Sequence, residues 1–162
     1  FLSNGRASVS TALENLGKIL YAAGPNKRVR IATESNWYIH ADLFKLGTVA
    51  EESHVLFPTN VSLVCSYNIN DMLKYTRIYH LAKLIEKHSH AMLKVNRINA
   101  SKIEIYSYLK ALAITLMRKR GLGVQTPFQN TPLSSMLNRL DRQDALEIEK
   151  EMEKRLRETL QI

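Results

Sequence analysis

Apolar side chains change their spacing along the first third of the chain. Over residues 9–23 they recur every three or four positions, which is the period of one face of an amphipathic helix. Gly24-Pro25 follows and is a typical helix stop. Residues 28–33 (RVRIAT) then form a short run with β-branched side chains, which predicts a strand. Helical spacing returns afterwards and predicts a second helix over roughly 38–56.

The strongest strand pattern in the chain is Val61–Tyr67 (VSLVCSY). Its apolar run favours a strand that is buried on both faces, as in a parallel sheet. Asp71 can cap a third helix, which we expect over residues 71–88. A third strand is expected at Met92–Val95.

The last sixty residues are predominantly helical in pattern. Ser101-x-x-Glu104 has the spacing of a capping box and precedes a helical apolar register. Residues 121–132 are rich in Gly, Pro and polar side chains and predict a linker, and Thr131-Pro132 within it predicts a helix start. An apolar stripe runs through roughly 133–161. Asp144 interrupts that stripe, so one bent helix and two helices both remain open.

This order of elements predicts an α/β fold with a parallel sheet covered by helices. We expect an α/β core over residues 1–100. A helical extension over 101–162 would contain a basic helix, the linker at 121–132 and a C-terminal amphipathic helix. Three strands are few for an isolated sheet, so upstream residues or a partner chain are expected to cover its open edge.

The charge of the chain favours anionic partners. There are 23 Lys and Arg residues against 15 Asp and Glu, for a formal net charge of +8. The candidate nucleic-acid-binding residues are the two basic clusters, Lys27, Arg28 and Arg30, and Arg118, Lys119 and Arg120. Phosphate contacts from such clusters give salt-sensitive binding. For the second cluster, complementing the dipole at the end of a helix is the simpler explanation.

The single cysteine, Cys65, excludes an internal disulfide and fits a reducing compartment. We find no signal peptide and no apolar run long enough to span a membrane. The expected location is the cytoplasm, with no membrane partner.

Motifs for nucleotide and metal chemistry are missing from the sequence. It contains no G-x-x-x-x-G-K-[ST], and no G-x-G-x-x-G follows a strand, so ATP chemistry has no visible anchor. Five histidines are present, but none forms H-E-x-x-H, and His88-x-His90 suits a solvated helix end. We therefore expect no metal, no cofactor and no catalytic residues, and a phosphate-handling enzyme is the least favoured class of function.

Polar and aromatic side chains follow the first two predicted strands. Ligands of open parallel sheets bind beyond the carboxyl ends of the strands. The ligand-binding candidates are therefore Glu34, Asn36, Trp37, Tyr67 and Asn68. The alternative is structural: Trp37 packs in the core, Glu34 caps a helix and Asn68 shapes a turn.

Three segments together resemble the second half of the MEDS domain, the methanogen/methylotroph sensory domain. They are residues 27–37 (KRVRIATESNW), 57–68 (FPTNVSLVCSYN) and 88–93 (HSHAML). The positions that match the family's motifs are Glu34, Trp37, Cys65, Tyr67, His88 and His90. Asn68 stands where the family usually has an aspartate, and Ala32-Thr33 replace the segment expected before the glutamate.

The MEDS family is similar to KaiC/RecA-type ATPase domains that have lost their hydrolytic residues. The resemblance covers about residues 7–95 and implies a partial or degenerate RecA-like sheet and a sensory or regulatory role. We therefore expect a non-catalytic module in signalling or transcription control that binds a ligand or a protein partner. The C-terminal helices are the expected contact surface and would form a homo-oligomer. The alternative is a nucleic-acid- or ribosome-associated protein that uses the basic clusters.

Overall fold

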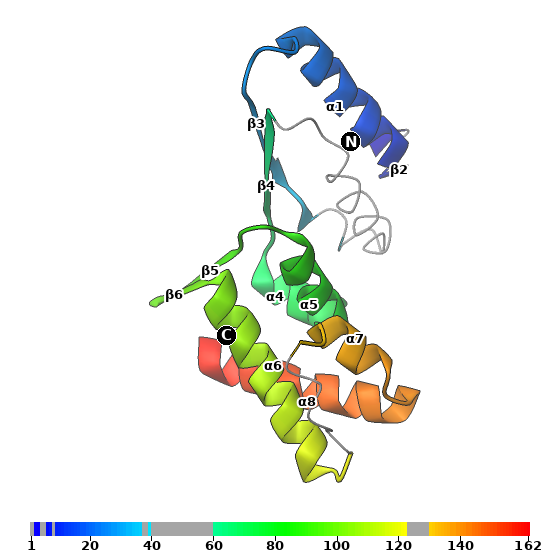
Figure 1. The fold of residues 1–162 in the computed structure, drawn as a ribbon, viewed down its shortest axis with the longest axis vertical. Coiled ribbons are helices and arrows are strands. Elements are labelled where there is room, and N and C mark those ends of the chain that lie inside the picture. The colour runs from blue at the N-terminus through cyan, green and yellow to red at the C-terminus, as the bar shows by residue number, and fades with distance from the viewer. Residues whose placement is uncertain (1, 4–5, 8, 37–38, 40–59, 123–129) are drawn as a thin grey trace. The chain divides into compact units, whose positions relative to one another are not determined.

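The computed structural model describes residues 2–3, 6–7, 9–36, 39, 60–122 and 130–162. The chain divides into two compact units, Phe1–Thr76 and Arg77–Ile162, and each is described by itself (Figure 1). Both contain helices and strands, so the α/β class is confirmed. No helix in the described part of the chain is both long and apolar enough to cross a membrane.

The first unit is built around a parallel pair of strands. Its elements are β1 (Leu2–Ser3), β2 (Arg6–Ala7), α1 (Val9–Ala23), β3 (Val29–Glu34), β4 (Val61–Ser66) and α4 (Ile69–Tyr75). Gly24 follows the end of α1; its N–H donates to the Leu20 carbonyl at 3.2 Å and its φ is +76°, a conformation that favours glycine. The second helix expected over 38–56 lies outside the described residues.

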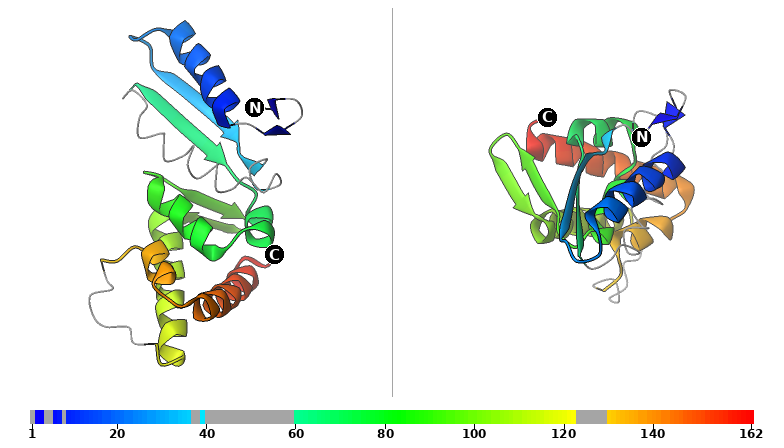
Figure 2. Two further views of the ribbon diagram at one scale, coloured as in Figure 1. Left: turned by 90° about the vertical axis from the view of Figure 1, so that its right-hand side faces the viewer. Right: turned by 90° about the horizontal axis from the view of Figure 1, so that it is seen from above.

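Strands β3 and β4 pair in parallel from Val29↔Val61 to Glu34↔Ser66, which confirms the predicted pairing. Helix α1 lies along one face of the pair (Figures 1 and 2). Burial alternates along both strands, so that Leu63 is half-buried whereas Val64 is 62 % exposed. The prediction that β4 is buried on both faces is therefore wrong, because its alternate side chains face solvent.

The single helix predicted over 71–88 is also wrong. Helix α4 ends at Tyr75, and α5 (Ile78–Lys87) starts a new helix. Thr76 and Arg77 between them have extended backbones, with φ/ψ of −127°/171° and −91°/153°. The first helix starts at Ile69 because Asn68, rather than Asp71, is its N-cap.

The second unit contains α5, a β-hairpin and three further helices. They are β5 (Met92–Val95), β6 (Ile98–Ser101), α6 (Lys102–Lys119), α7 (Leu133–Asn138) and α8 (Arg142–Leu160). Strand β5 pairs antiparallel with β6, so its predicted place in the parallel sheet is wrong. Asn96 at the turn has a φ of +51°, which asparagine tolerates better than most residues. The boundary between the units differs from the expected one at residue 100, because β6 leads directly into α6 and packs with it.

Local caps fix the ends of the later helices. The capping box at the start of α6 is confirmed, with the Ser101 N–H donating to Glu104 Oε2 at 2.8 Å and the Glu104 N–H donating to Ser101 Oγ at 3.5 Å. Pro132 is the N-cap of α7, so a helix does start at the predicted Thr131-Pro132. Asp141 Oδ1 accepts the Asp144 N–H at 2.8 Å and starts α8, so the C-terminal segment is two helices.

The apolar stripe of α8 forms part of the core of its own unit. Ile148 and Met152 are 0 % exposed, and Leu156 and Leu160 are buried with them. Burial of such side chains stabilises the unit by about 2 kcal/mol each. These side chains are therefore not available to a partner chain, and the homo-oligomer through the C-terminal helices stays a prediction.

Candidate functional site

The carboxyl ends of β3 and β4 bring three of the predicted ligand-binding residues together. The Asn68 N–H donates to Asn36 Oδ1 at 2.6 Å, which links the two segments that leave the strands. Glu34 is the last residue of β3 and pairs with Ser66, the last residue of β4. Of the two remaining candidates, Trp37 lies outside the described residues, and Tyr67 is the first residue after β4.

Both the backbone and the side chain of Asn68 form hydrogen bonds. Its side-chain Oδ1 accepts the N–H groups of Asn70 at 2.9 Å and Asp71 at 3.4 Å, at the start of α4. An N-cap of this kind contributes about 1 kcal/mol. Asn68 thus has a structural role as the N-cap of α4, where the sequence suggested a turn, and this cap also fixes the orientation of its side chain at the strand ends.

Small hydroxyl residues link the two strand ends by hydrogen bonds. The Ser35 N–H donates to the Ser66 carbonyl at 2.9 Å and continues the ladder beyond β3. Ser35 is 1 % exposed, and its Oγ lies 3.0 Å from Thr33 Oγ1. Ser66 Oγ donates to the Thr33 carbonyl at 3.3 Å. Sequence reasoning missed these three residues, although small hydroxyl side chains at both strand ends were a visible signal.

Several polar groups at this end have hydrogen-bonding capacity that the described residues do not use. In the described part of the chain no partner is seen for the Nδ2 groups of Asn36 and Asn68 or for the exposed Glu34 carboxylate. The Tyr67 hydroxyl is buried and has no hydrogen-bond partner there either. An unpartnered buried hydroxyl costs about 1–3 kcal/mol, so a ligand atom or a water molecule at this hydroxyl would be stabilising.

The first basic cluster lies at the start of β3. Lys27, Arg28 and Arg30 are all exposed. Asn60 Nδ2 donates to the Lys27 carbonyl at 2.7 Å and to the Pro25 carbonyl at 3.3 Å, which holds the turn before the strand. This cluster therefore presents its charges on an ordered segment.

The second basic cluster is divided between two roles. Arg118 and Lys119 are exposed in the last turn of α6, where cations complement the helix dipole. Arg120 instead forms an ion pair with Glu147 of α8 and lies 3.7 Å from Asp144. Hydrogen bonds from Gln143 and then Arg120 lower the pKa of Glu147. The sequence did not distinguish Arg120 from its two neighbours.

The histidines that suggested a metal are bonded locally. His88 Nδ1 lies 2.8 Å from the Leu84 carbonyl, and His90 Nδ1 lies 3.1 Å from Ser89 Oγ. Within the described ranges, no group of three or more His, Cys, Asp or Glu side chains is placed to hold a metal ion.

Two carboxylates of the second unit accept hydrogen bonds at the starts of helices that are far from them in the sequence. Glu149 of α8 binds Arg77 with both oxygens, with the Arg77 Nε at 3.2 Å, and accepts the Tyr79 N–H at 3.1 Å at the start of α5. Glu86 of α5 accepts hydrogen bonds from the Ser134 N–H at 3.0 Å and from the Ser134 hydroxyl, at the start of α7. The sequence could not reveal either contact, because Arg77 and Glu149 are 72 positions apart.

Tyr106 extends the cap of α7. Its hydroxyl donates to Glu86 Oε1 at 2.7 Å and accepts the Leu133 N–H at 2.8 Å. Burial, aided by Glu86, raises the pKa of Tyr106 to about 12. These groups hold helices together and do not converge on a reaction centre.

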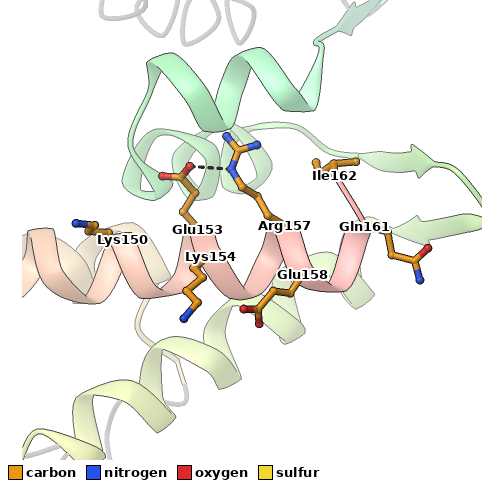
Figure 3. Close-up of a pocket in the computed structure, with 7 residues that line it drawn as sticks. All are labelled: Lys150, Glu153, Lys154, Arg157, Glu158, Gln161 and Ile162. Atoms are coloured by element: carbon orange, nitrogen blue, oxygen red, sulfur yellow. Dashed lines mark hydrogen bonds and ion pairs between the residues drawn. The ribbon is translucent and has the colours of Figure 1, made fainter.

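A hollow of about 530 Å³ runs along α8 and the end of the chain (Figure 3). It is lined by Lys150, Glu153, Lys154, Arg157, Glu158, Gln161 and Ile162. Glu153 accepts a hydrogen bond from Arg157 Nε at 2.9 Å, so part of the lining charge is compensated. The hollow is an open furrow on one helix, unlike the strand ends, where groups from two segments meet.

No protein-family model, curated protein or solved structure matches this chain. The resemblance to the MEDS domain therefore remains a prediction that rests on three short segments.

Proposed function

We propose that this chain is a non-catalytic sensory or regulatory module whose first unit binds a small polar ligand at the carboxyl ends of β3 and β4. The observation that carries the proposal is the hydrogen bond from the Asn68 N–H to Asn36 Oδ1. It joins segments that are 32 positions apart and orients the Asn36 side chain, whereas the Asn68 side chain is oriented by its cap of α4. Both residues follow the strand ends at Glu34 and Ser66. This is the edge where open parallel sheets bind their ligands.

The composition of this site suits binding better than catalysis. General acid–base catalysis needs a side chain that takes up or releases a proton near the working pH. The amides of Asn36 and Asn68 do neither, and they act as fixed donors and acceptors. Glu34 is the single carboxylate of the set.

The unused groups define the chemistry of the ligand. The Glu34 carboxylate accepts hydrogen bonds, and the two Nδ2 groups donate them. A ligand that carries a cationic or N–H group next to a carbonyl or carboxylate satisfies both kinds of group. Amino acids and short amides are therefore suitable probes.

The test is a thermal-shift series with the twenty amino acids and with simple amides at millimolar concentration. We expect at least one probe to raise Tm saturably in the wild type and to lose most of that effect in Glu34→Gln. Lys27→Gln is the matched control, because Lys27 is exposed and lies outside both strands, and it should keep the effect. The proposal is overturned when no probe raises Tm or when both variants respond like the wild type.

A second candidate function is nucleic-acid binding, which is favoured by the exposed cluster of Lys27, Arg28 and Arg30 on the ordered start of β3. Such binding would weaken steeply with rising salt, because each phosphate contact releases counterions. Filter binding to a generic DNA duplex and a single strand, titrated with salt, tests it. The Arg28→Ala variant should reduce the salt dependence more than Arg120→Ala, since Arg28 is exposed and Arg120 is already paired with Glu147. Absence of binding at low salt would exclude this function.

A further inference from the structure

One face of the β3–β4 pair is exposed. Burial alternates along both strands, and the exposed positions come into register as Arg30↔Ser62, Ala32↔Val64 and Glu34↔Ser66. We call these six residues the open face. At its centre Val64 is 62 % exposed.

An open face is unusual for parallel strands. Parallel sheets are almost always covered on both sides, because each face carries apolar side chains that are stabilised by burial. Val64 and Ala32 form an apolar centre, with polar or charged residues around them. This pattern, an apolar centre with a polar rim, is typical of a protein contact surface.

The charges of the open face are complementary to those of the same face on a second copy of the chain. Arg30 and Glu34 lie on the same side of β3, two positions before and two positions after Ala32. A two-fold axis that lies between the two faces and runs across the strands above Ala32 and Val64 reverses the strand direction in a second copy. Each Arg30 then faces the partner's Glu34, and each Val64 faces the partner's Val64. Interfaces of this self-complementary kind are the usual basis of homodimers.

We propose that two copies of this chain pair through their open faces, with β3 stacked antiparallel on the partner's β3. Stacked sheets pack about 10 Å apart, a distance that the Arg30 and Glu34 side chains bridge together. The small side chains of Ala32, Ser62 and Ser66 allow this approach. The face is small, so the dimer is weak, with a Kd of about 1–100 µM.

This dimer does not depend on the proposed ligand, and it is measured without one. Glu34 belongs to both sites, because it ends β3 beside Asn36 and also carries the charge that faces Arg30 of the second copy. A ligand that binds the Glu34 carboxylate therefore competes with the dimer. Failure of either proposal leaves the other standing, because the two are measured in separate samples.

The test is sedimentation velocity on the full chain across this concentration range, with charge-reversal variants. Arg30→Glu places two carboxylates opposite each other in both halves of the dimer, and Glu34→Arg does the same with two guanidinium groups. Each variant alone should associate at least about tenfold more weakly than the wild type, because facing like charges repel. Lys27→Glu makes the same charge change as Arg30→Glu but lies outside the strand, and it should stay within about twofold of the wild type.

Mixing the two charge-reversal variants is the decisive step. In the mixed dimer both facing pairs again have opposite charges, so association should return to near the wild-type level. In a parallel stack Arg30 would face Arg30 and Glu34 would face Glu34 already in the wild type, so neither variant alone would weaken association, and a dimer through another surface would not lose association in the variants either. Loss in each variant together with recovery in the mixture therefore identifies the antiparallel stack. Circular dichroism confirms that each variant is folded. If either is not, Arg30→Gln and Glu34→Gln replace them, and each should still weaken the dimer.

Three results would overturn the proposal. They are a wild-type monomer at every concentration, charge-reversal or neutral variants that associate as strongly as the wild type, and a mixture of folded charge-reversal variants that stays monomeric. Recovery in the mixture, with loss in each variant alone, supports the antiparallel stack.

Discussion

Glu149 in the middle of α8 binds the guanidinium of Arg77, the first residue of the second unit, with both of its carboxylate oxygens. Glu149 is only 4 % exposed. It also accepts the Tyr79 N–H at the start of α5, where an anion is favoured by the helix dipole. One buried side chain therefore anchors the beginning of the unit to its last helix.

Glu149→Gln should destabilise the second unit by about 2 kcal/mol. The substitution removes one charge of a partly buried pair and leaves the guanidinium without its partner, and the cost is moderated because Arg77 is half exposed. Urea denaturation followed by circular dichroism measures the change. Glu151→Gln on the same helix is the control. Its ion pair with Arg155 is on the surface, so its effect should stay below about 0.5 kcal/mol. Equal effects of the two substitutions would contradict the anchoring role of Glu149.

Tyr106→Phe should destabilise the chain by about 1–2 kcal/mol. The hydroxyl accepts the Leu133 N–H and donates to Glu86, so its removal leaves a helix N-terminus less satisfied. Tyr108→Phe is the matched control, since the Tyr108 hydroxyl bonds to Thr159 at an exposed position. An absorbance titration supplies a second measure. The titration step at about pH 12 should be absent in Tyr106→Phe and should remain in Tyr108→Phe.

The capping box of α6 predicts a pH dependence at Glu104. Hydrogen bonds from the Ser101 hydroxyl, and then from the Ser101 N–H, lower the pKa of Glu104 in the folded chain. A lowered folded-state pKa means that the cap contributes stability above the unfolded pKa of Glu104. This contribution is lost as the pH falls through the folded pKa. Carboxyl NMR titration should show Glu104 below 4.5 in the wild type and closer to 4.5 in Ser101→Ala. An unchanged titration in the variant would contradict the cap.

Local patterns predicted the elements that depend on near neighbours. The capping box at Ser101 and Glu104 involves residues three positions apart, and the pairing of β3 with β4 follows from two β-branched runs. In both cases the residues that decide the structure are close in the sequence or carry a clear period. The strand ends were located correctly for the same reason, because Asn36 and Asn68 each follow a strand.

Features that depend on distant partners could not be predicted in this way. The break between α4 and α5 accompanies the binding of Arg77 by Glu149, which is 72 positions later. The assignment of Met92–Val95 to the parallel sheet failed because its actual partner, β6, is a short strand beyond a two-residue turn. An apolar run alone did not reveal that one face of β4 is open, since burial depends on what covers the strand.

The side-chain amides of Asn36 and Asn68 offer the most direct test of the proposed binding site. Their ¹⁵N–¹H signals can be followed while the uniformly labelled chain is titrated with the amino-acid and amide probes. We predict saturable shifts at Asn36 and Asn68 for at least one probe. Asn96 should not respond, since its Nδ2 is held by the Leu160 carbonyl in the second unit. Saturable shifts confined to α8 or to the basic residues, or no shift with any probe, would contradict ligand binding at the carboxyl ends of β3 and β4.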